Sequence, residues 1–394
     1  MEDFEFHVPT QIIFGRETEQ QVGAQIRVHG GSRVLVVYGG GSAVRSGLLK
    51  RVETSLDQSD LPYIRLGGVR PNPRAALVRS GVELVREERL DFILAVGGGS
   101  VIDTAKAIAD SAAMDVDVWQ LWTRQVPLTA SLPVGVVLTI PAAGSETSDS
   151  AVLTNDEEKV KRGLSSPLHR PRFAIMNPEL VATLPPYQMA CGVVDILMHT
   201  MDRYFNPVTT NGLTDELAEA VLRTVIRCGK AAVEDRTDYG DVSELMWAGS
   251  LSHNGLTGLG GKKDFAPHQL GHELSATFDA AHGATLAAVW PSWARYCLSA
   301  DPSRFARFGK NVWGLSTEGK TERELALEAI EANERFFRSL GMPISLSGLG
   351  CGLQSEQQLA GLADRCSYGG TRTIGTFRVL GREDMLKIYQ MANH

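Results

Sequence analysis

The sequence lacks a framework of paired cysteines. Its five cysteines are scattered and include no CxxC pair: Cys191, Cys228, Cys297, Cys351 and Cys366. An odd number of isolated thiols argues against a disulfide scaffold and against a structural zinc knuckle. We therefore expect a cytoplasmic protein, because thiols stay reduced in that compartment.

Long apolar runs and an excess of positive charge are also missing. No apolar run approaches the ~20 residues of a membrane span. The N-terminal segment MEDFEFHVPT is acidic and lacks the charged-then-apolar layout of a signal peptide. The net charge of −7 disfavours broad nucleic-acid binding, which needs a basic surface. Neither a membrane nor a nucleic acid is therefore an expected partner.

The composition is that of a folded protein large enough for two or three domains. The chain has 394 residues, of which 43% are hydrophobic and 22% charged. Its first half alternates short apolar runs with amphipathic segments. The strand-like runs are 32–42, 61–69, 91–100 and 133–146, and the helical segments are 47–58, 74–90 and 101–113. This alternation predicts a Rossmann-like α/β domain with a doubly wound, mostly parallel sheet and helices on both faces.

The pattern changes after about Leu184, where strand-like runs almost disappear. Long segments with helical periodicity follow at 187–205, 212–234, 241–256, 265–277, 282–298, 301–313, 321–340 and 355–369. Pro185 and Pro186 suit the start of a helix and cannot continue a strand ladder. We therefore predict a dinucleotide-type α/β domain over 1–185 and an all-α domain over 186–394.

A glycine-rich loop, Gly97-Gly98-Gly99-Ser100, follows a predicted strand and opens a predicted helix. Such a loop lets a diphosphate approach the backbone amides, and the helix N-terminus adds a favourable partial charge. Asp103 lies on the first turn of that helix. The spacing is not GxGxxG, so the ordinary dinucleotide fingerprint is absent and a simple tight turn remains an alternative.

A second glycine loop runs from Tyr38 to Ser42, at the end of the first predicted strand. Ligands of doubly wound sheets bind at the carboxyl ends of strands, so both loops are expected to border one crevice. An acidic residue here would bind ribose hydroxyls and repel a 2′-phosphate, but the position holds Gly39, with Arg45 close behind. This favours NADP over NAD. The alternative is that Arg45 is only a solvated helix residue.

The second half contains acid and imidazole side chains at ligand spacing. Asp195 and His199 are four residues apart, as are His268 and His272, and His282 follows. Residues four apart on a helix point the same way. One carboxylate and three imidazoles suit Zn²⁺ or Fe²⁺. A histidine among apolar neighbours is also often a core residue, and spacing alone leaves both interpretations open.

These features together resemble the iron-containing (group III) alcohol dehydrogenase family, above all its NADP(H)-dependent butanol dehydrogenase and aldehyde reductase branch. The matching stretches occur in the family's order: YGGGSAVRSGLL, GGVRPNPRAALV, ILAVGGGSVIDTAKAIA, LTIPAAGSETS, GVVDILMHTMDRYF and HQLGHELSATFDAAHGATLA. The resemblance implies hydride transfer between NADP(H) and a small alcohol or aldehyde, with the metal in a cleft between two domains. It also implies a homodimer in which the strand at 11–14 pairs across subunits.

The resemblance also carries over individual roles. It assigns the metal ligands to Asp195, His199, His268 and His282, and it places His272 near the nicotinamide. We expect His272 to exchange the proton, with bound water as the rival and a structural role between helices as the alternative. The cofactor contacts that it implies are Gly39, Gly41, Ser42, Asn72, Gly98, Gly99, Ser100, Asp103, Thr139 and Lys161.

The chain departs from the family at Ala143, where threonine is common, and at Thr147-Ser148, where the branch often has Met-Asn. These positions are expected where nicotinamide and substrate meet. Alternatives with the same architecture are an NAD-dependent polyol dehydrogenase and a dehydroquinate-synthase-like lyase. The lyase needs a cluster of basic residues, for which Lys262 and Lys263 look too sparse. A metal hydrolase would leave both glycine loops without a purpose.

Overall fold

The computed structural model describes residues 1–158, 160–208 and 210–394. Its contacts divide the chain into two compact units, which we call the α/β unit and the helical unit. The α/β unit contains His7–Pro185 and Arg236–Ser250, and the helical unit contains Met1–Phe6, Pro186–Asp235 and Leu251–His394. The chain thus passes from the α/β unit to the helical unit between Pro185 and Pro186. Two segments depart from this division: Met1–Phe6 belongs to the helical unit, and Arg236–Ser250 belongs to the α/β unit. The predicted domains, 1–185 and 186–394, remain a prediction.

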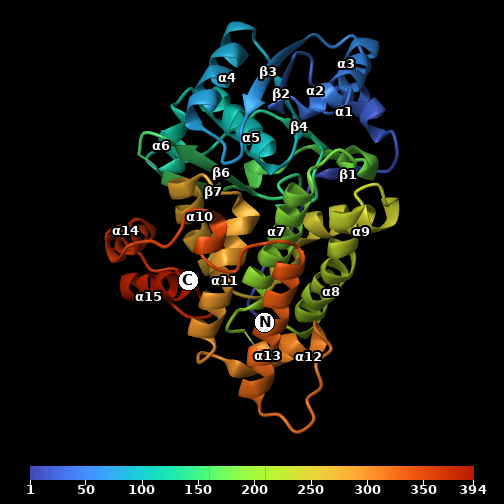
Figure 1. Cartoon of the computed structure of the whole chain (residues 1–394). Helices are drawn as coiled ribbons and strands as arrows, with labels where there is room; N and C mark the ends of the chain where they lie inside the picture. Colours follow the sequence, from blue (N-terminus) through green and yellow to red (C-terminus); the bar gives the residue numbers. More distant parts are fainter. Residues whose placement is uncertain (159, 209) are drawn as a thin grey trace. The chain divides into compact units, whose positions relative to one another are not determined.

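A six-stranded parallel sheet forms the centre of the α/β unit (Figure 1). Its strands, in spatial order, are β1 (Gln11–Phe14), β8 (Phe173–Met176), β5 (Val134–Leu138), β4 (Phe92–Gly97), β2 (Val34–Gly39) and β3 (Tyr63–Val69). Each neighbouring pair is parallel. The prediction of a doubly wound parallel sheet is therefore confirmed.

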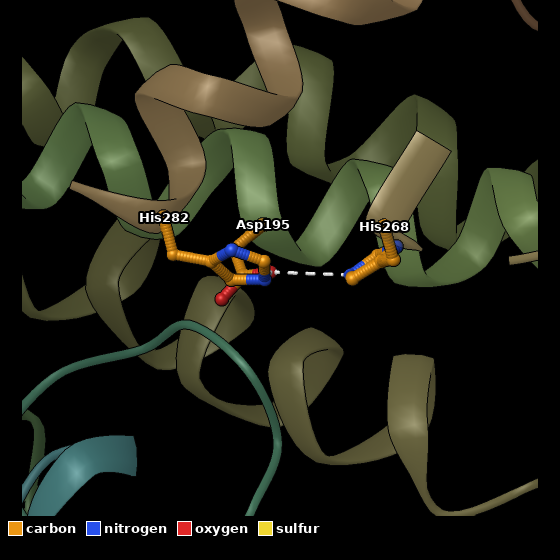
Figure 2. A group of neighbouring side chains, drawn as sticks. All are labelled: Asp195, His268 and His282. Atoms are coloured by element: carbon orange, nitrogen blue, oxygen red, sulfur yellow. Dashed lines mark ion pairs between the residues drawn. The ribbon is translucent and has the colours of Figure 1, made fainter. Parts of the chain in front are cut away.

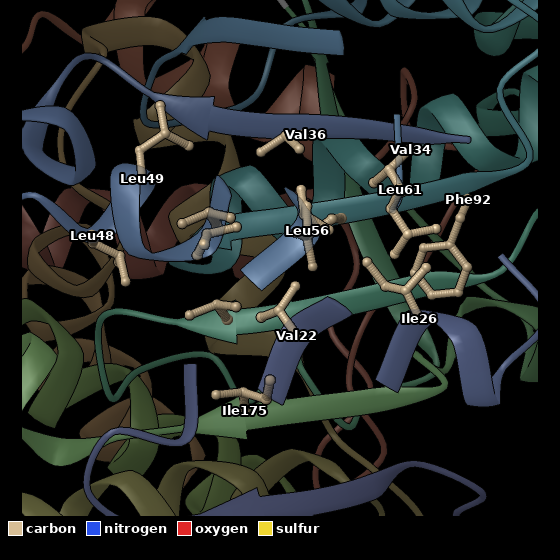
Figure 3. Packing of buried hydrophobic residues seen from close by; sticks show 14 of the residues in the cluster. Val22, Ile26, Val34, Val36, Leu48, Leu49, Leu56, Leu61, Phe92 and Ile175 are labelled. Atoms are coloured by element: carbon tan, nitrogen blue, oxygen red, sulfur yellow. The ribbon is translucent and has the colours of Figure 1, made fainter. Parts of the chain in front are cut away.

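The middle strands are apolar throughout because helices cover both of their faces. Alternate residues such as Val34 and Val36 pack against Ile26 of α1 (Val22–Val28) and Leu56 of α3 (Leu48–Gln58) (Figure 3). Helices α4 (Ala75–Glu87) and α5 (Gly99–Met114) cover the opposite face (Figure 1). Gly81 permits this packing, since a Cβ there would lie 2.4 Å from Ile108 Cδ1.

Several smaller elements of the α/β unit were not expected from the sequence pattern. An antiparallel hairpin joins β6 (Ser150–Asn155) to β7 (Val160–Ser165). Strand β8 was also not predicted, nor were the short helices α2 (Ser42–Arg45) and α6 (Val118–Trp122).

The helical unit contains the long helices expected from the periodicity of the second half. They are α7 (Pro186–Tyr204), α8 (Gly212–Glu234), α10 (Ala266–Phe278), α11 (His282–Cys297), α12 (Pro302–Asn311), α13 (Glu322–Ser339), α14 (Glu356–Cys366) and α15 (Arg382–Ala392). Only α15 was not predicted, and α7 begins at Pro186, as its sequence indicated. Helix α9 (Tyr239–His253) begins in the α/β unit. In the described part of the chain, no helix is long and apolar enough to cross a membrane.

Candidate active site

Three polar residues recur along one buried face of α7. Asp195, His199 and Asp202 are spaced i, i+4 and i+7, so they lie on the same side of the helix. Asp195 Oδ1 lies 3.4 Å from His199 Nε2. The sequence spacing predicted this first pair, whereas it assigned no role to Asp202.

Two further helices bring imidazoles to the same carboxylate. His268 of α10 and His282 of α11 each place Nε2 3.8 Å from Asp195 Oδ1. Figure 2 shows the three side chains pointing toward one another. One ligand atom of each lies within 4.8 Å of the others, a spacing that could hold a metal ion.

A glycine explains how α11 comes so close to α7. A Cβ on Gly283 would lie 2.1 Å from the carbonyl oxygen of Cys191, one turn before Asp195 on α7. Any other residue would push the two helices apart. The missing side chain at Gly283 therefore lets the adjacent His282 reach Asp195.

The other predicted histidines surround this group. The His199 ring lies 4.2 Å from the His268 ring between centroids, and its pair with His253 is stacked at 3.9 Å. His253 has no partner at ligand spacing in the sequence, so no role was expected for it. His272 lies 5.2 Å from His282 between ring centroids, beside the three-residue group but not within it.

Asp202 orients one of the candidate ligands. Its Oδ2 lies 2.5 Å from His268 Nδ1, while Nε2 of the same ring faces Asp195. A carboxylate behind a ligand histidine fixes its tautomer and increases its basicity. The backbone carbonyl of Asp202 accepts a hydrogen bond from the Asp264 N–H. Burial and the nearby Asp202 carboxylate raise the pKa of Asp264 to about 6. The signal for Asp202 in the sequence was its i+3 spacing from His199.

Two of the candidate ligand histidines have pKa values shifted in opposite directions. Burial and the neighbouring imidazoles of His253 and His268 hold the pKa of His199 well below its usual value, and a neutral ring is the form that binds a metal. Burial alone would lower the pKa of His268, but the carboxylates of Asp202 and Asp195 outweigh it and raise the pKa.

A divalent cation fits these residues. Among the described residues, Asp195 Oδ1 and His268 Nε2 are buried and lack a hydrogen-bond partner. Buried polar atoms are nearly always paired, so two such atoms facing each other indicate a ligand between them. One carboxylate with imidazole nitrogens is a donor set that zinc and iron accept.

The two predicted glycine loops follow adjacent strands of the α/β unit. Strands β2 and β4 are parallel neighbours, with Tyr38 beside Val96, and the strand order reverses between them. The carboxyl ends at such a reversal are where doubly wound sheets bind ligands. Gly98 has no room for a side chain, since a Cβ would lie 2.2 Å from Ile140 Cγ2. Thr139, at the end of β5, donates its N–H to the Gly97 carbonyl at 3.2 Å.

The remaining predicted cofactor residues also lie in this unit. Gly39 ends β2, Ser42 begins α2, and between them Gly41 has a φ of +117°, which glycine adopts readily. Arg45 Nη1 lies 3.1 Å from the Cβ position of Gly41, so the guanidinium folds back over the turn.

Two further predicted residues contact each other directly. Asn72 has a left-handed φ of +56°, and its Oδ1 accepts a hydrogen bond from Lys161 Nζ at 3.0 Å. The structure therefore brings these two residues together, although they are far apart in the sequence.

Three residues near the glycine loop have internal partners. Both carboxylate oxygens of Asp103 accept hydrogen bonds, from Ser145 Oγ at 2.6 Å and from the Val152 N–H at 3.0 Å. Thr147 Oγ1 donates to the Ser250 carbonyl, and Ser148 Oγ donates to the Ser150 carbonyl, both at 3.2 Å.

The buried hydroxyls of Thr147 and Ser148 thus bond within the α/β unit, and the expectation that these positions lie where nicotinamide and substrate meet remains a prediction. Ala143 differs from them, since its Cβ lies 3.5 Å from the Cβ position of Gly99 in the glycine loop.

Comparisons with known proteins agree over the whole chain. Residues 9–178 match the family described as iron-containing alcohol dehydrogenase, and residues 189–393 match the C-terminal domain of the Fe-containing alcohol dehydrogenase family. The chain is 40% identical over 391 residues to NADH-dependent butanol dehydrogenase A of Clostridium acetobutylicum, covering 99% of both chains. It is 36% identical over 395 residues to the NADPH-dependent aldehyde reductase YqhD of Escherichia coli, covering 100% of both. The crystal structure of NADH-dependent butanol dehydrogenase A from Thermotoga maritima superposes with a TM-score of 0.95 at 35% identity, covering 100% of this chain and 99% of the other.

Proposed function

Because the chain belongs to the iron-containing alcohol dehydrogenase family, we propose that Asp195, His199, His268 and His282 hold one divalent metal, Fe²⁺ or Zn²⁺. The enzyme is an NAD(P)-dependent alcohol dehydrogenase or aldehyde reductase. The observation that carries the metal proposal is the convergence of Asp195, His268 and His282 from three helices, with ligand atoms within 4.8 Å of one another.

The chemistry divides between the bound groups and the chain. A metal held there supplies Lewis-acid polarisation of a carbonyl or hydroxyl group, and the nicotinamide gives or accepts the hydride. Asp202 holds His268 in one orientation, which keeps Nε2 directed at Asp195. We assign proton exchange to His272, the one predicted histidine beside the ligand group that is not itself a ligand.

We propose that the two glycine loops and residues of neighbouring segments bind the coenzyme. These residues are Gly39, Gly41, Ser42, Asn72, Gly98, Gly99, Ser100, Asp103, Thr139 and Lys161. The names of the relatives divide between NADH and NADPH, so the preference rests on the residues of this chain. No acidic residue occurs between Tyr38 and Lys50, and Arg45 lies over the turn. A 2′-phosphate would meet a cation there and no carboxylate, which supports NADPH as the preferred coenzyme.

We propose that the enzyme is a homodimer in the cytoplasm. Strand β1 is at the edge of the sheet, which leaves one side of it available for pairing. Beside it, a hollow of about 410 Å³ is lined by Ile12, Phe14, Ser243, Glu244 and Trp247, and the two aromatic residues are 40% and 44% exposed. A second copy of the strand and its neighbours would cover this apolar surface.

The five free cysteines support a reducing compartment.

The other readings of the sequence are not favoured. The relatives described above are named for butanol and aldehyde chemistry, not for polyol oxidation or phosphate elimination. Lys262 Nζ lies 3.6 Å from Glu2 Oε1, so this lysine pairs with an acid of its own unit instead of forming a basic cluster.

The experiment that tests the proposal is a panel of short aldehydes and alcohols with NADPH and with NADH. It uses protein stripped of metal by a chelator and then restored with Fe²⁺ or Zn²⁺. We expect no turnover without metal, recovery on restoration, and faster turnover with NADPH than with NADH. Equal turnover by stripped and restored protein would refute the metal site. A consistent advantage of NADH would refute the coenzyme preference.

A further inference from the structure

Helix α5 carries a fully buried ammonium group that the proposed function does not use. Lys106 is 0% exposed and lies on the helix that the Gly98–Ser100 loop opens. Five oxygen atoms surround its Nζ, all from the loop that joins β5 to β6 or from the start of β6. They are the carbonyls of Ser145, Ser148 and Ser150 at 2.7, 3.2 and 2.9 Å, and the hydroxyls of Ser145 and Ser148 at 3.0 and 3.4 Å.

This arrangement is a cage for a cation. A lysine ammonium has three N–H donors, and burying it is unfavourable unless oxygen atoms replace its water. Among the described residues, the loop itself does not supply a hydrogen-bond donor for each of the three backbone carbonyls that point at this centre. Lys106 is therefore the internal cation around which this loop folds.

Asp103, one turn earlier on α5, also links this helix to the loop between β5 and β6. Its Oδ1 accepts from Ser145 Oγ, the hydroxyl that also contacts Lys106, and its Oδ2 accepts the N–H of Val152 in β6. One helix thus holds the loop through two side chains of opposite charge, which restricts the conformations open to the segment 145–152.

The other half of the same connection lies against the glycine loop. A Cβ on Gly98 would lie 2.2 Å from Ile140 Cγ2, and a Cβ on Gly99 would lie 3.5 Å from Ala143 Cβ. Residues 139–150 therefore form a wall beside the segment proposed to receive the diphosphate. A movement of this wall would change the space beside Gly98 and Gly99.

We propose that Lys106 is a positioning residue for coenzyme binding. Its ammonium holds the 139–150 segment in the shape that leaves the Gly98–Ser100 loop open to a nicotinamide nucleotide, without touching the nucleotide. This inference rests on the proposed function, because it takes the glycine loop as the diphosphate site.

The test compares Lys106→Met with a control on the same helix. Asp110 is also fully buried, one turn further on. Its Oδ2 lies 2.7 Å from His169 Nε2, and among the described residues its Oδ1 has no hydrogen-bond partner. In metal-loaded enzyme we expect Lys106→Met to raise the Kd and KM for NADPH by about ten- to a hundredfold, the effect of losing hydrogen bonds to a charged group. The KM for the aldehyde at saturating NADPH should change little. Asp110→Asn should lower the Tm and leave the Kd for NADPH unchanged.

A milder variant keeps the test valid if Lys106→Met does not fold. Ser145→Ala removes only the hydroxyl shared by Lys106 and Asp103, and we expect it to raise the Kd for NADPH by about threefold or more. An unchanged Kd in every folded variant at Lys106 and Ser145 would overturn the inference. So would an equal loss of affinity in Asp110→Asn. If the unaltered enzyme binds no nicotinamide nucleotide, the proposed function fails; if it binds and the variants bind equally well, only the role of Lys106 fails.

Discussion

The two units present their candidate sites in opposite ways. In the α/β unit, the loops at Gly39–Ser42 and Gly97–Ser100 offer mainly backbone, because glycine leaves the amides uncovered. In the helical unit, carboxylate and imidazole side chains from α7, α10 and α11 converge on one point. Each candidate site nevertheless includes a glycine where two segments nearly touch: Gly98 against Ile140 and Gly283 against Cys191. The comparison indicates that substitutions in the helical unit should abolish the chemistry, whereas those in the α/β unit should mostly change coenzyme affinity.

The largest expected effect is that of His268→Ala, which would sharpen this contrast. The variant should lose its metal, and turnover should fall by about a thousandfold or more, because Lewis-acid assistance contributes several kcal/mol. Its Kd for NADPH should stay close to that of the unaltered enzyme. Metal analysis by mass spectrometry, steady-state turnover and a fluorescence titration measure these three quantities. Full activity in the variant would remove His268 from the ligand set.

Gly283→Ala tests whether the close approach of two helices sets the position of His282. The added Cβ would meet backbone atoms of Cys191, which cannot move aside as a side chain can. We expect a loss of about 1–3 kcal/mol in unfolding free energy. Turnover should fall by about a hundredfold, since a displacement near 1 Å has that effect.

Gly271→Ala is the matched control for this substitution. It lies in α10, and its Cβ would come closest to two side-chain atoms, of Leu286 at 3.0 Å and Thr285 at 3.3 Å, with the backbone N of Leu286 at an ordinary contact distance of 3.7 Å. These atoms can shift, so the control should retain most of the activity. If both variants behave alike, the contact between Gly283 and Cys191 has no special importance.

Asp202→Asn should have an intermediate effect. The amide can still accept a hydrogen bond from His268 Nδ1, but the negative charge that increases the basicity of the ring is gone. We expect metal affinity to fall by about ten- to a hundredfold, as is typical when a partner behind a ligand is replaced. Competition with a chelator of known affinity measures the change. Unaltered affinity would mean that Asp202 acts only in folding.

The smallest expected effect is that of Gly39→Asp, in the α/β unit. Space is available, because a Cβ on Gly39 would lie 3.6 Å from the Val69 carbonyl and 3.9 Å from Val101 Cγ2. The carboxylate should repel a 2′-phosphate and weaken NADPH binding by about tenfold while sparing NADH. Gly39→Ala controls for the added volume. Equal effects on the two coenzymes would remove the argument for NADPH.

Much of the fold could be predicted from periodicity. The central strands β2 and β4 are buried on both faces, so their continuous apolar runs were a strong signal. The hairpin of β6 and β7 was missed because its residues, SAVLTN and VKRGLS, mix polar and apolar types without clear alternation. Strand β8 has only four residues, too few for a reliable period.

The candidate site was predictable where the chemistry lies in one helix and not where it depends on contacts between distant segments. The pairs Asp195–His199 and His268–His272 are visible as i, i+4 spacing. Asp202 could have been found by extending that face of α7 one turn further. The cage around Lys106 could not, because it joins one lysine to carbonyls about forty positions away whose residue types carry no signal.

The passage of the chain between its two units has a practical consequence for engineering. Peptide bonds link the units at four places, after residues 6, 185, 235 and 250. Consider a chimera with a relative, made to exchange coenzyme specificity, in which the two sequences are joined once, at the central prolines. It would combine Arg236–Ser250 of one parent with the sheet of the other. Transplanting the whole α/β unit therefore needs a second insert that carries Arg236–Ser250 along.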